Sequence, residues 1–140
     1  MNLHTTNYTN TFITVAEDCP AKTGEIPPAE KDRLTAAAIQ HECIIKHPYQ
    51  YTSDDILFLV YALHNELSLS EYDTAREVFF SKDQPCFRSS PLPRRYGWGV
   101  HFDARGKIAI YGMETPDYKK FAEDRNLNVI QAMRSSKLIR

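Results

Sequence analysis

The stretch YGWGVHFDARGKIAIYG, residues 96–112, constrains the fold more than any other part of the chain. Large apolar residues alternate with small or polar ones on both sides of Ala104-Arg105-Gly106, and such alternation is typical of half-buried strands. The tripeptide suits a hairpin loop in which Gly106 adopts the left-handed conformation. We therefore predict a β-hairpin over about residues 96–112, with Asp103 opposite Lys107.

This pairing predicts the register of the whole hairpin. It sets Phe102 opposite Ile108, His101 opposite Ala109, Val100 opposite Ile110, Gly99 opposite Tyr111 and Trp98 opposite Gly112. All the large apolar pairs then lie on one face of the sheet, and a slip by one residue would move every side chain to the opposite face. We expect the rings of Tyr96, Trp98 and Phe102 to face the core.

Other patterns predict one further strand and about four helices. The β-branched run TFITVA predicts a strand over Thr11–Ala16. Helical spacing, capping signals and prolines predict helices over about residues 34–47, 52–67, 70–82 and 115–122. Residues 127–133 fit both a strand and a helix, which leaves that segment open. The predicted fold is a single α+β domain, residues 1–140, with an antiparallel sheet around the hairpin packed against the helices.

Composition narrows the class of protein. Hydrophobic residues make up 42% of the 140 residues and charged residues 25%, values typical of globular domains. The longest apolar run, ILFLVYAL, is much shorter than the roughly 18 residues of a membrane span, and the N-terminus lacks the pattern of a secretory leader. We therefore expect a soluble cytoplasmic protein with no membrane partner.

The cysteines and histidines carry no spacing that favours a disulfide or a metal. Three cysteines without close pairing suit reduced thiols, and the five histidines are scattered along the chain. We predict no disulfide, no metal site and no cofactor.

The net charge of −1 hides an asymmetry. Residues 1–84 contain 6 Lys+Arg and 13 Asp+Glu, whereas residues 85–140 contain 11 and 5. A basic half attracts nucleic acid or an acidic protein, but it also neutralises the acidic half of the same domain. The pI near 6.5 favours internal neutralisation over nucleic-acid binding. An interaction module that uses the basic C-terminal part remains an alternative.

The stretch RSSPLPRRYGWGVHF, residues 88–102, is the main candidate for a binding site. On the hairpin face away from the core, Gly97 and Gly99 leave a shallow trough beside His101 and Tyr111. Either a ligand occupies this trough, or Tyr111 lies over Gly99 and fills it, as aromatic side chains commonly do. Arginines bind anions and histidine titrates near neutrality. We hypothesise a small anionic or planar ligand beside Arg88, Arg94, Arg95, His101 and Tyr111.

Cys86 is the candidate nucleophile of a second hypothesis, a thiol-dependent enzyme. Nearby arginines lower the pKa of a thiol below its usual value of about 8.5. A phosphatase-like loop is excluded, because the residue six positions after Cys86 is Leu92 and the loop contains no glycine. A generic reactive thiol therefore remains, and the sequence leaves open whether the protein is an enzyme.

Five longer strings point to a family. The strings NTFITVAEDCP, PYQYTSDDILF, FFSKDQPCFRSSPLPRRYGWG, GKIAIYG and AMRSSK resemble a family of small bacterial and fungal proteins of about 140 residues, classed only as a domain of unknown function. The resemblance spans nearly the whole chain and implies that these residues form a complete protein. It implies no activity, substrate, cofactor, partner or catalytic residue. The oligomeric state also stays open.

Overall fold

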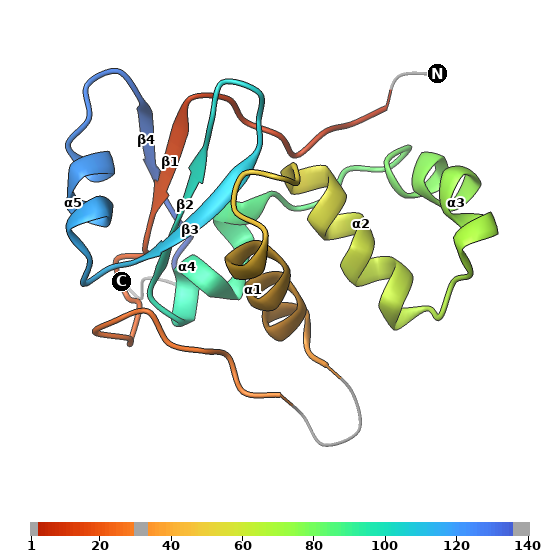
Figure 1. Ribbon diagram of the computed structural model, residues 1–140, viewed down its shortest axis with the longest axis horizontal. Coiled ribbons are helices and arrows are strands. Elements are labelled where there is room, and N and C mark those ends of the chain that lie inside the picture. Colours follow the sequence, from red (N-terminus) through yellow and green to blue (C-terminus); the bar gives the residue numbers. More distant parts are fainter. Residues whose placement is uncertain (1–2, 30–33, 136–140) are drawn as a thin grey trace, which may run out of the picture.

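The computed structural model describes residues 3–29 and 34–135. Four strands, five α-helices and two short 3-10 turns follow each other along this part of the chain (Figure 1). In chain order they are β1 (Thr11–Thr14), α1 (Ala36–Lys46), α2 (Ser53–His64), η1 (Leu69–Glu71), α3 (Tyr72–Phe79), η2 (Phe87–Ser89), α4 (Pro91–Arg95), β2 (Trp98–Phe102), β3 (Ile108–Gly112), α5 (Pro116–Ala122) and β4 (Asn128–Gln131).

The predicted hairpin and its register are confirmed. Strands β2 and β3 pair antiparallel from Trp98 opposite Gly112 to Phe102 opposite Ile108, with every intermediate pair as predicted. Gly106 has a φ of +78°, and the Asp103 backbone N–H donates to the Lys107 carbonyl at 2.9 Å. The strand begins at Trp98 rather than at Tyr96, because Tyr96 ends helix α4.

The α+β class is confirmed, but the sheet is mixed rather than wholly antiparallel. Its strand order is β3-β2-β1-β4, with β1 antiparallel to β2 and parallel to β4. Residues 127–133, for which the sequence fitted both a strand and a helix, therefore contain a strand, β4. Alternation along a segment indicates a strand but carries no information on the direction of its partner. The chain reaches β4 from β3 by crossing the sheet through α5, which makes the last pairing parallel.

The helices differ from the prediction in two places. The proline-rich segment forms an additional short helix, α4, in which Ser90 caps the first turn and Pro91 takes the first helical position, where its missing N–H costs nothing. The predicted helix over residues 70–82 consists of η1 followed by α3, which ends at Phe79. Within the described residues, every helix is too short or too polar to cross a lipid bilayer.

Helices cover both faces of the sheet (Figure 1). On one face, α1, α2 and α4 enclose the main core with the inward side chains of the strands. Its largest fully buried members are Phe87, Phe102, Ile13, Ile44, Ile56, Leu92, Ile108 and Val100. Trp98 packs against this core but stays partly exposed, and its indole N–H donates to the Glu25 carbonyl at 2.7 Å. The opposite face is covered by α5.

Tyr118 of helix α5, together with Phe12 of β1, fills the space beside Gly99. The ring of Phe12 lies edge-on to the ring of Tyr118 at 5.2 Å, and both rings sit above Gly99. A Cβ atom at Gly99 would lie 2.4 Å from Phe12 Cζ and 2.7 Å from Tyr118 Cε2. The predicted trough is therefore filled at Gly99 by Phe12 and Tyr118 rather than by Tyr111, and at Gly97 it is covered by the Thr23 backbone.

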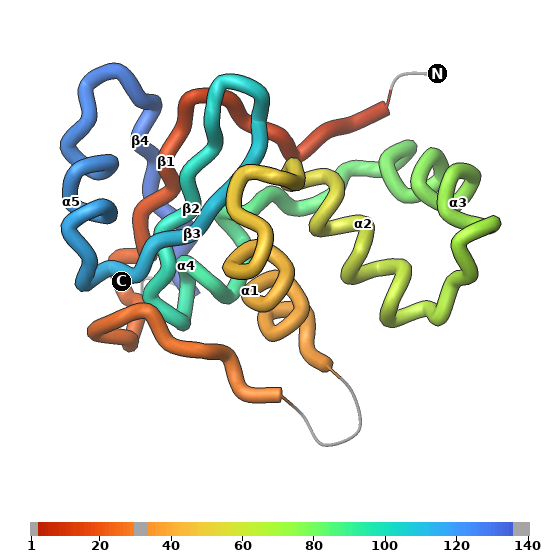
Figure 2. Tube along the Cα trace, in the orientation of Figure 1, coloured from red at the N-terminus to blue at the C-terminus, as the bar shows by residue number. Residues whose placement is uncertain are grey.

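Helices α2 and α3 extend away from the sheet and pack around a second, smaller core (Figure 2). This core consists of buried Phe58, Ala62 and Phe80, with Leu67, Tyr72, Ala75 and Phe79 partly buried around them. Helix α2 is apolar on several sides, yet Tyr61 and Leu63 are 39% and 48% exposed. We name α2, η1 and α3, residues 53–79, the helical arm.

The N-terminal residues bind the first turn of α2 through a buried polar network. The Asp54 carboxylate accepts hydrogen bonds from the Thr5 hydroxyl and from both the backbone N–H and the hydroxyl of Thr6, all at 2.7 Å. The Thr6 hydroxyl also contacts the Ser53 hydroxyl at 2.7 Å. Asp54 and Thr6 are 8% and 5% exposed, so water does not replace these bonds when they are lost.

We expect Gly99→Ala to destabilise the protein by about 1–3 kcal/mol, because the added methyl group overlaps with Phe12 and Tyr118. Urea unfolding of the two proteins measures the difference. The double variant Phe12→Leu/Gly99→Ala removes the overlapping ring atoms, so its loss should be smaller than the sum of the two single losses. Additive losses would contradict this packing.

We expect Asp54→Ala to lower the free energy of unfolding by about 2–3 kcal/mol, because it leaves the Thr6 N–H and hydroxyl buried without their acceptor. The matched control is Asp83→Ala, which removes an ion pair with His4 whose aspartate side chain is 89% exposed. That control should change stability by less than about 0.5 kcal/mol. Equal effects in urea unfolding would show that the network contributes nothing.

Candidate functional site

Two of the three arginines predicted to bind a ligand, Arg88 and Arg94, donate hydrogen bonds to backbone carbonyls of the protein. Arg88 Nε donates to the Gln131 carbonyl at 2.8 Å, and the Arg88 carbonyl accepts from the Met133 N–H at 2.9 Å. Arg94 reaches the carbonyls of Ser89 and Arg134, each at 3.4 Å. Arg88 and Arg94 thus hold the segment that follows β4 against η2 and α4. Arg95 is exposed on the last turn of α4.

His101 and Tyr111 come together elsewhere, at a tyrosine that the sequence analysis missed. The Tyr49 hydroxyl contacts His101 Nδ1 and the Tyr111 hydroxyl, both at 2.8 Å. The His101 ring stacks on Phe121 of α5, with ring centroids 4.1 Å apart and planes 18° apart. Within the described residues, no hydrogen bond joins this group to the three predicted arginines. The structure thus divides the predicted site into two separate groups.

Tyr49 reaches this position through an unusual backbone conformation. Its φ is +60°, in the left-handed region that costs a non-glycine residue about 1–3 kcal/mol. Its N–H donates to the Ile108 carbonyl at 2.8 Å, and Ile108 in turn donates to the Tyr51 carbonyl at 2.9 Å. The loop between α1 and α2 therefore pairs with the outer edge of β3. No short-range pattern encodes a contact between residues 52 positions apart, so this position of Tyr49 had no signal in the sequence.

His101 and Tyr49 are both neutral at pH 7. Burial lowers the pKa of His101, and the nearby carboxylates of Asp103 and Asp124 only partly oppose this effect. Burial also raises the pKa of Tyr49, and the hydrogen bond to Tyr111 raises it further. The three side chains form a chain of neutral hydrogen bonds against α5, which suits a packing role.

Cys86 contacts one side chain that bears on its reactivity. The Tyr8 hydroxyl lies 3.3 Å from the Cys86 sulfur. Burial raises the pKa of Tyr8 to about 12, helped by the contact with Cys86 and opposed by Arg88. The phenol therefore stays protonated at neutral pH and cannot act as a base toward the thiol. Cys86 is half-buried, and its nucleophilic role stays a prediction.

The described residues contain a cleft that the sequence analysis did not anticipate. It encloses about 410 Å³ between the C-terminal half of α1, the following loop and the helical arm. Aromatic and aliphatic side chains form most of its wall, and a few polar groups point to the same space. The lining residues are Cys43, Gln50, Tyr51, Asp55, Ile56, Phe58, Leu59, Tyr72 and Arg76. We name this the aromatic cleft.

An ion pair fixes Arg76 at the wall of the aromatic cleft. One terminal nitrogen of Arg76 lies 2.9 Å from Asp55 Oδ1. The guanidinium carbon lies 6.0 Å from the ring centre of Phe58 and 5.6 Å from that of Phe80. Within the described residues, Asp55 is its only acceptor, so other N–H donors of the guanidinium are available to a ligand.

The sequence placed Asp55 correctly in the first turn of α2 but missed its partner Arg76. The capping box with Thr52 is confirmed: Thr52 accepts from the Asp55 N–H at 3.1 Å, and Asp55 accepts from the Thr52 N–H at 2.9 Å. Burial raises the pKa of Asp55, but hydrogen bonds from Thr52 and Arg76 outweigh it and hold the pKa below its usual range. Asp55 is therefore charged at neutral pH.

The thiol in the aromatic cleft is protonated. Burial raises the pKa of Cys43, and the carboxylates of Asp55 and Glu42 raise it further. A protonated thiol is a poor nucleophile and a poor metal ligand. Across residues 3–29 and 34–135, no three His, Cys, Asp or Glu side chains gather closely enough to hold a metal ion.

We expect acid to destabilise the protein partly through His101. Its lowered pKa means that the unfolded chain takes up a proton first as the pH falls. The contribution of the neutral ring is present above the ordinary pKa of about 6.5 and is lost as the pH falls toward the lowered value. Urea unfolding between pH 7 and pH 5 should therefore show falling stability in the native chain and a smaller fall in His101→Gln.

His41 supplies part of the same pH dependence and serves as the comparison. Burial lowers its pKa as well, against the opposing effect of Glu42, and its ring packs 5.1 Å from the ring of Trp98. The His101→Gln variant should keep the part of the pH-dependent loss of stability that comes from His41. An unchanged pH dependence in His101→Gln would refute the role assigned to His101.

The comparisons with known proteins give a family but no activity. No curated protein matches the chain, and no solved structure matches it. The model of one protein family, described as a family of unknown function (DUF6157), matches residues 3–138. The match covers nearly all of the 140 residues, in agreement with the resemblance noted above. The chain therefore belongs to the family of unknown function DUF6157.

Proposed function

We propose that this protein binds a small planar anion, such as an aromatic carboxylate, in the aromatic cleft. The observation that carries the proposal is the state of Arg76. Asp55 and two phenylalanine rings hold its guanidinium in place, while some of its N–H donors have no acceptor in the described residues. A guanidinium with free donors recognises a carboxylate in a bidentate geometry.

The walls of the aromatic cleft favour a planar ligand. Tyr51 and Tyr72 supply ring surfaces, and aromatic pairs are worth about 0.5–1.5 kcal/mol beyond the area that they bury. The volume of about 410 Å³ is in the range of small-molecule sites. The ligand's ring would pack on these side chains while its anionic group binds Arg76.

This proposal keeps the class of ligand suggested by the sequence but changes the residues that bind it. Arg88 and Arg94 already donate to backbone carbonyls, so fewer of their donors are free for an anion. Of the three arginines, Arg95 is the exposed one. A site at residues 88–101 that uses Arg95 therefore stays a prediction, and the experiment below tests it with Arg95→Gln.

We also propose that the protein works in the cytoplasm. Cys19, Cys43 and Cys86 are all free thiols, and all are partly buried. Reduced thiols persist in a compartment that glutathione and thioredoxin keep reducing.

We expect aromatic carboxylates to raise the melting temperature of the native chain, because a ligand that binds only the folded state stabilises it by mass action. Benzoate, salicylate and indole-3-acetate are suitable probes, with toluene and cyclohexanecarboxylate as tests of the charge and the ring. Arg76→Gln should weaken binding by about 1.5–3 kcal/mol, which is tenfold or more, because it removes hydrogen bonds between charged partners.

Arg125→Gln is the matched control, since Arg125 is an exposed arginine between α5 and β4. Because Arg76→Gln also breaks the pair with Asp55, Tyr72→Leu provides a second variant that keeps the charges and removes one ring. Binding that survives both Arg76→Gln and Tyr72→Leu would exclude the aromatic cleft. Loss of binding in Arg95→Gln alone would move the site to residues 88–101.

A further inference from the structure

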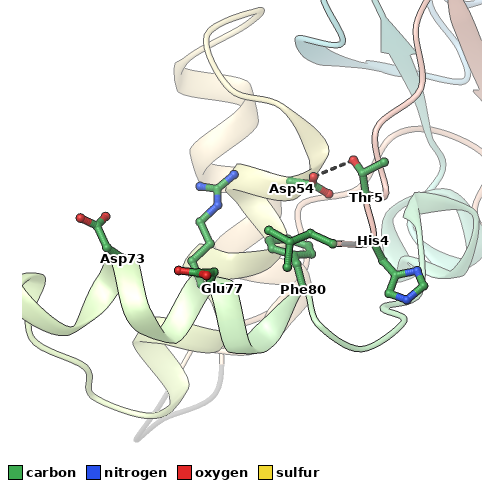
Figure 3. A pocket seen from close by; sticks show the side chains of 8 residues that line it. His4, Thr5, Asp54, Asp73, Glu77 and Phe80 are labelled. Atoms are coloured by element: carbon green, nitrogen blue, oxygen red, sulfur yellow. Dashed lines mark hydrogen bonds between the residues drawn. The ribbon is translucent and has the colours of Figure 1, made fainter. Parts of the chain in front are cut away.

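A second cleft lies on the other side of Arg76, between helix α3 and the N-terminal residues. It encloses about 410 Å³ and is lined by Leu3, His4, Thr5, Asp54, Asp73, Arg76, Glu77 and Phe80. Figure 3 shows Asp73 and Glu77 on α3, with Phe80 between that helix and His4 and Thr5. We name this the acidic groove. Its chemistry differs from that of the aromatic cleft and does not depend on the function proposed there.

One face of α3 carries the charge of the acidic groove. Asp73, Arg76, Glu77 and Phe80 follow the i, i+3, i+4, i+7 spacing that places side chains on one side of a helix. Arg76 is paired with Asp55, whereas Asp73 and Glu77 have no hydrogen bond or ion pair in the described residues. Like charges four residues apart destabilise a helix by a few tenths of a kcal/mol. A cation bound between the two carboxylates would remove this repulsion.

The helical arm as a whole is also negatively charged. Residues 53–79 contain six Asp and Glu against one Lys or Arg, Arg76. Leu3 and Phe80 are the apolar residues that line the acidic groove; Leu3 is 50% exposed and Phe80 4%, so Leu3 supplies most of the apolar surface. The groove therefore combines an apolar surface with a negative rim, which is the complement of a segment that carries both apolar and basic side chains.

We propose that the acidic groove docks a basic amphipathic segment of a partner protein. An apolar side chain of that segment packs on Leu3, at the edge of Phe80, and a lysine or arginine binds between Asp73 and Glu77. The negative potential of the helical arm steers the positive segment toward the groove. Charge complementarity disfavours an arm-to-arm contact between two copies of the chain, because both arms carry the same negative charge; a contact with the copy's basic residues 85–140 is an outcome that the test below distinguishes.

The test uses the full chain and a fluorescent 14-residue peptide of two LKKLLKK repeats, with the Lys→Glu and Leu→Ser versions as controls. Fluorescence anisotropy should show binding of the first peptide that weakens as salt rises, with both controls at least tenfold weaker. Backbone amide NMR shifts on adding the peptide should centre on residues 3–5 and 73–80.

The variant Asp73→Asn/Glu77→Gln should weaken this binding five- to tenfold, and Leu3→Ala about threefold. The matched control, Glu25→Gln/Glu123→Gln, removes the same charge from exposed positions outside the helical arm and should change binding by less than twofold. Equal losses in the two double variants, shifts spread over the whole surface, or equal binding of the Leu→Ser peptide would overturn the proposal. Self-association of the chain that Asp73→Asn/Glu77→Gln abolishes would also overturn it, in favour of a second copy.

Discussion

The path of the chain from β3 to β4 determines how the rest of this structure is arranged. These two strands form opposite edges of the sheet, so the connection between them must cross one of its faces. Helix α5 is that connection, and Tyr118 and Phe121 on it pack against Phe12 and His101. The hairpin face at Gly99 is therefore a surface on which helix α5 packs. The same crossing makes β4 parallel to β1 and places α5 against β1 and β3, while β4 stays largely exposed.

The basic stretch around residues 88–95 also stabilises the fold, because Arg88 binds the C-terminal end of β4 and the residues after it. The side chain and the carbonyl of Arg88 both bind the segment that leaves β4. A sheet edge exposes unpaired N–H and C=O groups, which natural proteins cover or pair. Arg88 covers part of the β4 edge in this way. The arginine Arg88 near the aromatic residues thus has a structural role at β4, in addition to any capacity to bind anions.

The helical arm borders clefts because its outer part packs on a small core of its own, while Ile56 and Leu57 of α2 pack with the main core. Phe58, Ala62 and Phe80 form the buried part of that small core, and α2 also joins the arm to the rest of the molecule. Asp54 ties the first turn of α2 to the N-terminal residues, while Asp55 ties it to Arg76 on α3. Two adjacent aspartates therefore hold two different segments. Arg76 separates the aromatic cleft from the acidic groove and gives each of them one wall.

The sequence by itself determined the elements whose signals are local. The register of β2 and β3 followed from alternation around Gly106, and the start of α2 followed from the capping box of Thr52 and Asp55. Both depend on residues close together in the chain, where spacing alone decides which side chains and backbone groups meet. The α+β class and the family followed from the sum of such patterns.

Only the tertiary structure decided the direction of β4, the filling of the Gly99 trough and the composition of the candidate sites. Tyr49 meets His101 across 52 positions, and Arg76 meets Asp55 across 21. A residue's spacing pattern reports which side of its own element it occupies, but not which distant element packs against that side. The stacking of His101 on Phe121 of α5 is of this kind, because the position of a helix over a sheet is fixed by long-range packing.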